Sequence, residues 1–137
     1  MNKRTVQAYF WVTFLISLLA LFLNGGLGLL VFGIVILAAL IFHVIVGLKW
    51  KYSINKNYLI TLSATNLLLF ALVRVDGVHA FTDSGLSALL NLIGLSGGYS
   101  RRYEELFMWT SLLLFISQVV IDIALYRKNK QVRSVIN

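Results

Sequence analysis

The chain has 137 residues, of which 59% are hydrophobic and 12% are charged, and its formal net charge is +7. Soluble domains are about 45–50% apolar and about 25% charged, and so short a chain cannot bury this much apolar surface in one core. The composition therefore indicates a protein whose solvent is lipid. Because the chain has no cysteine, it also excludes a disulfide-stabilised scaffold and a cysteine-ligated zinc or iron–sulfur protein.

Four apolar segments are long enough to cross a membrane, and they cover residues 6–23, 27–48, 58–75 and 106–126. A bilayer core of about 30 Å is spanned by about 17–25 helical residues. We therefore predict a single all-α membrane domain, residues 1–137, folded as a four-transmembrane-helix bundle. The first segment is longer than the apolar region of a signal peptide, about 7–15 residues, so we expect it to remain as the first helix of a hairpin.

The connection before the fourth segment contains a further helical pattern at residues 84–95. Large apolar side chains recur there with helical spacing, and small or polar ones fall on the opposite face. The apolar face holds Leu86, Leu89, Leu90 and Ile93, and the other face holds Ser84, Ser87, Asn91 and Gly94. This segment is too short to span a bilayer. We predict a short amphipathic or re-entrant helix that is capped by Asp83 or Ser84 and ended by Gly97-Gly98.

The basic residues predict the orientation. With a cytoplasmic N-terminus, most of them lie inside and no acidic residue does, as the positive-inside rule requires. The inside set is Lys3, Arg4, Lys49, Lys51, Lys56, Arg127, Lys128, Lys130 and Arg133. Both termini are then cytoplasmic, and we expect the cytoplasmic membrane of a bacterium. Contact with anionic lipid headgroups accounts for the positive charge, so a nucleic-acid partner is not expected.

Two titratable side chains, His43 and Asp122, lie within the predicted spans. At 1.5 Å per residue they are about 9 and 7.5 Å from the cytoplasmic boundary, and their helices run in the same direction, so a pair across the second and fourth helices is possible. Gln118 lies one turn from Asp122, and Asn66 lies near the midplane. Polar groups in lipid are costly. Two interpretations stay open: a proton- or cation-linked site, or a structural pair that joins helices, which we favour.

A second group of charged residues is predicted at the extracytoplasmic side. It consists of Arg74, Asp76, His79, Asp83, Arg101, Arg102, Glu104 and Glu105. Solvated surface pairs are a sufficient explanation, and the alternative is a recognition surface for a peptide, a lipid headgroup or a protein. His43 and His79 fall on opposite sides of the membrane, so they do not form a bis-histidine haem site within one chain. We expect no metal and no cofactor, and the sequence contains no catalytic motif.

Small and weakly polar stripes on the predicted helices are typical of close helix packing. On the first segment this stripe is Thr13, Ser17, Ala20 and Asn24. Aromatic residues near the segment ends, among them Phe10, Trp50 and Trp109, are typical of anchors at the headgroup boundary. The sequence thus favours a non-catalytic accessory, assembly or immunity-type protein that binds a membrane partner or a second copy of itself. The alternatives are a small oligomeric transporter or channel that uses the His43–Asp122 site, and a membrane redox subunit.

Overall fold

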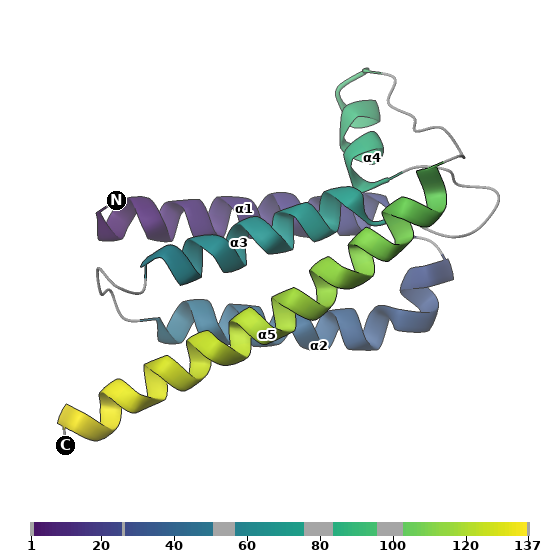
Figure 1. Ribbon diagram of the computed structural model, residues 1–137. Helices are drawn as coiled ribbons and strands as arrows, with labels where there is room; N and C mark the ends of the chain where they lie inside the picture. Colours follow the sequence, from purple (N-terminus) through teal and green to yellow (C-terminus); the bar gives the residue numbers. More distant parts are fainter. Residues whose placement is uncertain (1, 26, 51–56, 76–83, 96–102, 137) are drawn as a thin grey trace.

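The computed structural model describes residues 2–25, 27–50, 57–75, 84–95 and 103–136, which form helices, their caps and one isolated antiparallel bridge between Val75 and Ser84 (Figure 1). The helices are α1 (Lys3–Leu23), α2 (Leu27–Lys49), α3 (Asn57–Val73), α4 (Gly85–Leu92) and α5 (Glu104–Ile136). Three of them have the length and hydropathy of a membrane-crossing helix: α1, α2 over Val31–Lys49, and α5 over Glu104–Lys130. The all-α prediction is confirmed for the described residues, and α3 is a shorter apolar helix of 17 residues.

The four long helices lie side by side as a bundle. Figure 1 shows α1 and α3 running in one direction and α2 and α5 running in the other, so that both termini lie at the same end. Helix α3 packs against both α1 and α5, whereas α2 makes its principal contacts with α5. Helix α3 is therefore the central helix of the bundle, although it is the shortest of the four.

Helix α5 is longer than the fourth apolar segment, which we placed at residues 106–126. It continues through the basic residues that follow Tyr126 and ends at Ile136. The continuation has a simple cause: residues 127–136 contain neither glycine nor proline, and the Arg, Lys and Gln residues among them favour helix. The apolar boundary thus marks the predicted end of the span and not the end of the helix.

Helix α4 stands across the bundle at the end opposite the termini (Figure 1). The Ser84 hydroxyl caps it by accepting from the backbone N–H of Ser87. It ends earlier than predicted, because Gly94 adopts a positive φ of 76°. The Leu95 N–H then donates to Leu90 O at 2.9 Å and the Gly94 N–H donates to Asn91 O, which is the usual glycine-dependent helix end. Gly97-Gly98, which we expected to end this helix, lie outside the described residues.

The face that α4 turns toward the bundle is the small, polar one. Ser84, Gly85 and Ser87 are buried, while Leu86 and Leu92 are exposed. Gly85 allows this approach, since a Cβ at that position would overlap the backbone carbonyl of Ala71 on α3. On the apolar side of α4, Leu89 is half-buried and packs against the core, whereas Leu86, Leu92 and Ile93 face away from the protein.

Two clusters of buried apolar residues form the core. The cluster on the side of the termini consists of Val6, Phe10, Val46, Trp50, Ile60, Ala64 and Leu125. The cluster on the side of α4 consists of Ala20, Leu21, Ile36, Leu40, Leu67, Phe70 and Ala71. Phe10 and Trp50, which we interpreted as headgroup anchors, are only 3% and 7% exposed. Their rings face neighbouring helices and belong to the core.

Candidate functional site

A layer of buried polar residues separates the two apolar clusters. On α1 and α2 the polar residues lie between the two clusters along the helix; on α2, for example, His43 lies between Leu40 and Val46. The polar layer consists of Thr13, Ser17, His43, Ser63, Asn66, Gln118 and Asp122, and each is at most 8% exposed. The Thr13 and Ser17 hydroxyls donate to carbonyls of their own helix. The other five residues connect α2, α3 and α5.

The centre of the layer is a direct contact between His43 on α2 and Asp122 on α5. The His43 Nδ1 lies 3.1 Å from Asp122 Oδ2 and 3.3 Å from Oδ1. The two residues are 0% and 1% exposed. Equal depth on two helices of the same direction made this pair possible in the sequence, and the structure places the two side chains in contact.

Ser63 and Gln118 complete the surroundings of the carboxylate. The Ser63 hydroxyl donates to Asp122 Oδ1 at 2.5 Å. The Gln118 amide nitrogen lies within hydrogen-bond distance of three atoms: Asp122 Oδ2 at 3.0 Å, Ser63 Oγ at 2.9 Å and His43 Nδ1 at 3.0 Å. With the ring proton assigned to Nδ1, His43 donates to the carboxylate, and the two hydrogens of the Gln118 amide go to Asp122 Oδ2 and Ser63 Oγ.

The hydrogen bonds extend from Gln118 toward the middle of the bundle. The Asn66 amide on α3 donates to Gln118 Oε1 at 2.9 Å and to the carbonyl of Leu114 at 2.9 Å. The Ser117 hydroxyl donates to Asn66 Oδ1 at 3.0 Å. The direction of donation is thus the same throughout, from Ser117 through Asn66 and Gln118 to Asp122. The network joins the central helix α3 to α5 over several turns.

The far side of the His43 ring faces aromatic residues of α1. The ring stacks on Phe10 with centroids 4.6 Å apart and an interplanar angle of 21°, and it lies 6.0 Å from the ring of Phe14. Gly47 gives Phe10 this space, because a Cβ there would overlap its ring. The His43 Nε2 is buried and has no hydrogen-bond partner among the described residues. His43 therefore has one ring nitrogen on a carboxylate and the other in an apolar environment.

The predicted extracytoplasmic cluster is placed only in part. Asp76, His79, Asp83, Arg101 and Arg102 lie outside the described residues. Arg74, expected at the surface, is only 6% exposed. Its Nη1 donates to the carbonyl of Asn24 at 3.1 Å, and the Asn24 amide donates to the Arg74 carbonyl at 2.7 Å. These two bonds fasten the connection between α1 and α2 to the end of α3. Glu104 is half-buried and Glu105 is exposed.

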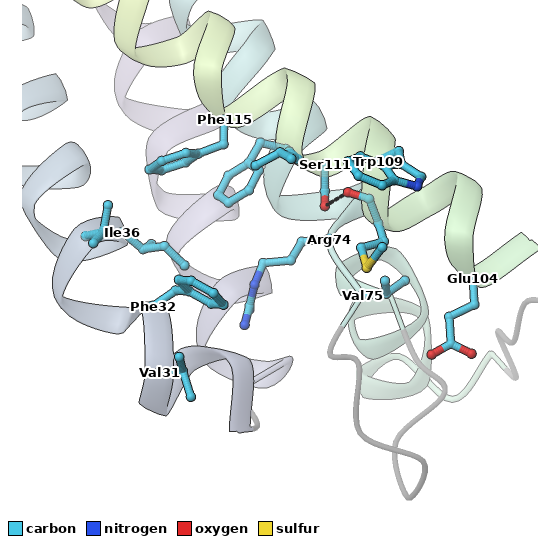
Figure 2. A pocket seen from close by; sticks show the side chains of 13 residues that line it. Val31, Phe32, Ile36, Arg74, Val75, Glu104, Trp109, Ser111 and Phe115 are labelled. Atoms are coloured by element: carbon cyan, nitrogen blue, oxygen red, sulfur yellow. Dashed lines mark hydrogen bonds between the residues drawn. The ribbon is translucent and has the colours of Figure 1, made fainter.

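A cavity of about 600 Å³ opens beside Arg74, between α2 and α5 (Figure 2). Its walls are mostly apolar and include Phe32, Phe115 and Trp109. Figure 2 shows Arg74 among the lining side chains, with Phe32 on one side in this view and Glu104 on the other. Cavities of this size and composition are typical of small-molecule sites.

Sequence reasoning missed two members of the polar network, Ser63 and Ser117. Ser63 lies one turn before Asn66, so the two share a face of α3, but nothing in the sequence links that face to Asp122. Ser117 carries no pattern that would single it out.

The part of the chain that the structure describes contains no group of three or more His, Cys, Asp or Glu side chains that could hold a metal ion. Comparisons with family profiles, curated proteins and solved structures found no match.

Proposed function

We propose that this chain is a small proton-linked transport protein of the bacterial cytoplasmic membrane, with four spans and both termini in the cytoplasm. Three helices of spanning length support this topology. At 17 residues α3 reaches the lower limit of about 17–25 residues for a span, and it lies between α1 and α5. The location of both termini at one end of the bundle (Figure 1) fits an even number of spans, and the positive-inside rule assigns that end to the cytoplasm.

Single-cysteine variants test the topology, since the chain has no cysteine of its own. The variants Lys3→Cys and Lys130→Cys place a thiol at the end of the termini, and Tyr103→Cys places one at the opposite end; all three positions are exposed. In intact cells a membrane-impermeant maleimide should label only the Tyr103→Cys variant. Labelling of Lys3→Cys or of Lys130→Cys would contradict the four-span arrangement.

The observation that carries the transport proposal is the buried contact between His43 and Asp122. Serine, asparagine and glutamine can join membrane helices by themselves, and the layer already contains all three. An acid–base pair adds the ability to take up and release a proton, at the cost of keeping titratable groups in lipid. The His43 Nε2 is the atom that can accept this proton while Nδ1 stays on the carboxylate. Because the pair joins α2 to α5, a change in its charge acts on the contact between these helices.

A second candidate is the accessory role favoured by the sequence. The polar layer supports this role, because apolar clusters enclose it on both sides. In that role the network only holds the helices together, and the protein acts by binding a membrane partner. A partner that co-purifies in fixed stoichiometry in mild detergent would favour this candidate.

Proton flux into proteoliposomes separates the two functions. Purified protein is reconstituted with a pH-sensitive dye inside the vesicles, and influx is driven by an imposed membrane potential. We expect influx well above that of protein-free vesicles, and a loss of about tenfold or more in Asp122→Asn, which keeps the shape of the side chain but removes its acid. The matched control is Glu105→Gln, an exposed carboxylate of the same helix. Wild-type influx equal to that of empty vesicles, or equal influx in Asp122→Asn and wild type, would refute the transport proposal.

A further inference from the structure

The two nitrogens of the His43 ring have opposite surroundings. Four polar atoms lie within 3.3 Å of Nδ1: both carboxylate oxygens of Asp122, the Ser63 hydroxyl and the Gln118 amide nitrogen. Nε2, by contrast, is buried and has no hydrogen-bond partner among the described residues. Native proteins leave few buried polar atoms unpaired, so the environment of Nε2 indicates a role beyond holding helices together.

Helix α1 covers the His43 ring with one of its faces. Phe10 and Phe14 both stack on the ring, with centroid distances of 4.6 and 6.0 Å and interplanar angles of 21° and 24°. Thr13 lies between them in the sequence, on the same face of the helix, and is only 4% exposed. It is thus the polar side chain of α1 that is flanked by both rings.

The Thr13 hydroxyl has acceptor capacity that the structure does not use. Its single hydrogen is directed to carbonyls of its own helix, with Tyr9 O at 2.8 Å and Phe10 O at 3.0 Å. A hydroxyl also has two acceptor lone pairs. Within the described part of the chain, no group donates a hydrogen bond to Thr13 Oγ1.

A proton on Nε2 changes what this part of the bundle must supply. In the neutral ring Nε2 is an acceptor, and in the charged ring it is a donor. The faces of Phe10 and Phe14 attract a cation, but they offer no acceptor for an N–H group, and a buried charged donor without an acceptor is costly. Among the described residues of α1, α3 and α5, Asp122 is the ionised side chain in contact with the ring, and Nδ1 already binds it.

We propose that Thr13 accepts the hydrogen bond of Nε2–H when His43 is charged, and that it thereby positions the ring in the protonated state. The Thr13 hydroxyl keeps its donation to Tyr9 O and accepts from Nε2–H through a lone pair. The structure then corresponds to the neutral state, and the two groups meet between the phenylalanine rings when a proton binds. The inference rests on the proposed function in one respect, because it takes Nε2 as the atom that binds the proton.

Proton influx into proteoliposomes tests the hydroxyl. Thr13→Val replaces it by a methyl group, and Thr13→Ser retains it. We expect Thr13→Val to lower influx about fivefold and Thr13→Ser to keep most of it. The matched control is Thr61→Val on α3, since the Thr61 hydroxyl also donates to a carbonyl of its own helix, Asn57 O. Equal influx in Thr13→Val and wild type, or an equal loss in the valine and serine variants, would overturn the inference.

Nuclear magnetic resonance distinguishes failure of this inference from failure of the transport proposal. The chain has two histidines, so isotope labelling of histidine gives two ring signals, and His79→Gln identifies that of His43. In acidified samples the Nε2–H resonance of His43 should shift in Thr13→Val and stay in place in Thr61→Val. An unchanged resonance in Thr13→Val overturns the inference alone, and a shifted resonance without any wild-type influx refutes transport alone. A His43 ring that binds no proton in acid overturns both.

Discussion

Replacement of Asp122 by alanine should destabilise the folded bundle more than any other single change in the polar network. The substitution removes the acceptor for three neighbours: the Ser63 hydroxyl, the Gln118 amide and the Nδ1 proton of His43. Ser63 and Gln118 keep the hydrogen bond between them. The His43 proton retains only Ser63 Oγ, at 3.2 Å, as a remaining acceptor.

The expected loss follows from two known ranges. Side-chain hydrogen bonds between membrane helices average about 0.6 kcal/mol and reach about 1.7 kcal/mol. Loss of one partner from a buried charged pair costs about 3–5 kcal/mol in soluble proteins. Because Ser63 and Gln118 still satisfy one another, we expect Asp122→Ala to lower the free energy of unfolding by about 2–3 kcal/mol. Asp122→Asn retains an acceptor for Ser63, so it should lower it by about 1 kcal/mol.

Reversible unfolding in mixed micelles measures these differences, with a denaturing detergent added stepwise and helicity followed by circular dichroism. A double-mutant cycle with His43→Ala isolates the contact between the two residues. We expect a coupling free energy of at least about 1 kcal/mol. The control is Glu105→Ala, an exposed acid of α5 whose loss should change stability by less than about 0.5 kcal/mol. A coupling indistinguishable from zero, or an Asp122→Ala variant as stable as the control, would refute the contact between α2 and α5.

Three glycines give further predictions. Gly85→Ala should displace α4, because the added Cβ overlaps the Ala71 carbonyl; faster hydrogen exchange across α4 would report this, and unchanged exchange would contradict it. Gly94→Ala meets open space but places alanine at a φ of 76°, so it should cost about 1–2 kcal/mol and affect only the end of α4. Gly47→Ala should push the Phe10 ring from its place and destabilise the bundle by about 1–3 kcal/mol. In that background Phe10→Leu should recover part of the loss, and a further loss would argue against the contact.

The polar pair could be anticipated from the sequence because depth in a membrane helix is a one-dimensional quantity. Lys49 and Arg127 mark a common boundary, and a rise of 1.5 Å per residue puts His43 and Asp122 at similar distances from it. The spacing of four residues also placed Gln118 beside Asp122. Contact between α2 and α5, by contrast, depends on which helices are neighbours and on how each is rotated about its axis. The sequence around Ser63 does not show which helix lies beside it or toward which helix its side chain is turned.

Arg74 shows the same limit at the other end of the bundle. It follows an apolar segment, and a charged residue in that position usually lies in water. One of its partners is the carbonyl of Asn24, 50 residues away. Every residue has a backbone carbonyl, so the sequence does not indicate which carbonyl accepts this bond. Helix α4 was foreseen from its apolar spacing, but its early end depends on the backbone conformation of Gly94.

The direction of donation in the polar network bears on how the protein is made. His43, Ser63 and Asn66 belong to α2 and α3 and are translated before Gln118 and Asp122 of α5. An aspartate at the centre of an inserting helix costs about 2.5–3.5 kcal/mol. In the proposed topology Asp122 lies nearer the cytoplasmic end of α5, so its cost is smaller, and it falls on the last long helix to leave the ribosome. In that topology His43 and Ser63, on α2 and α3, are inserted before Asp122, and the third neighbour, Gln118, arrives with it on α5. In the proposed topology, insertion of α5 thus completes the hydrogen bonds that α2 and α3 contribute to the network, which couples membrane integration of the C-terminal helix to the packing of these three helices.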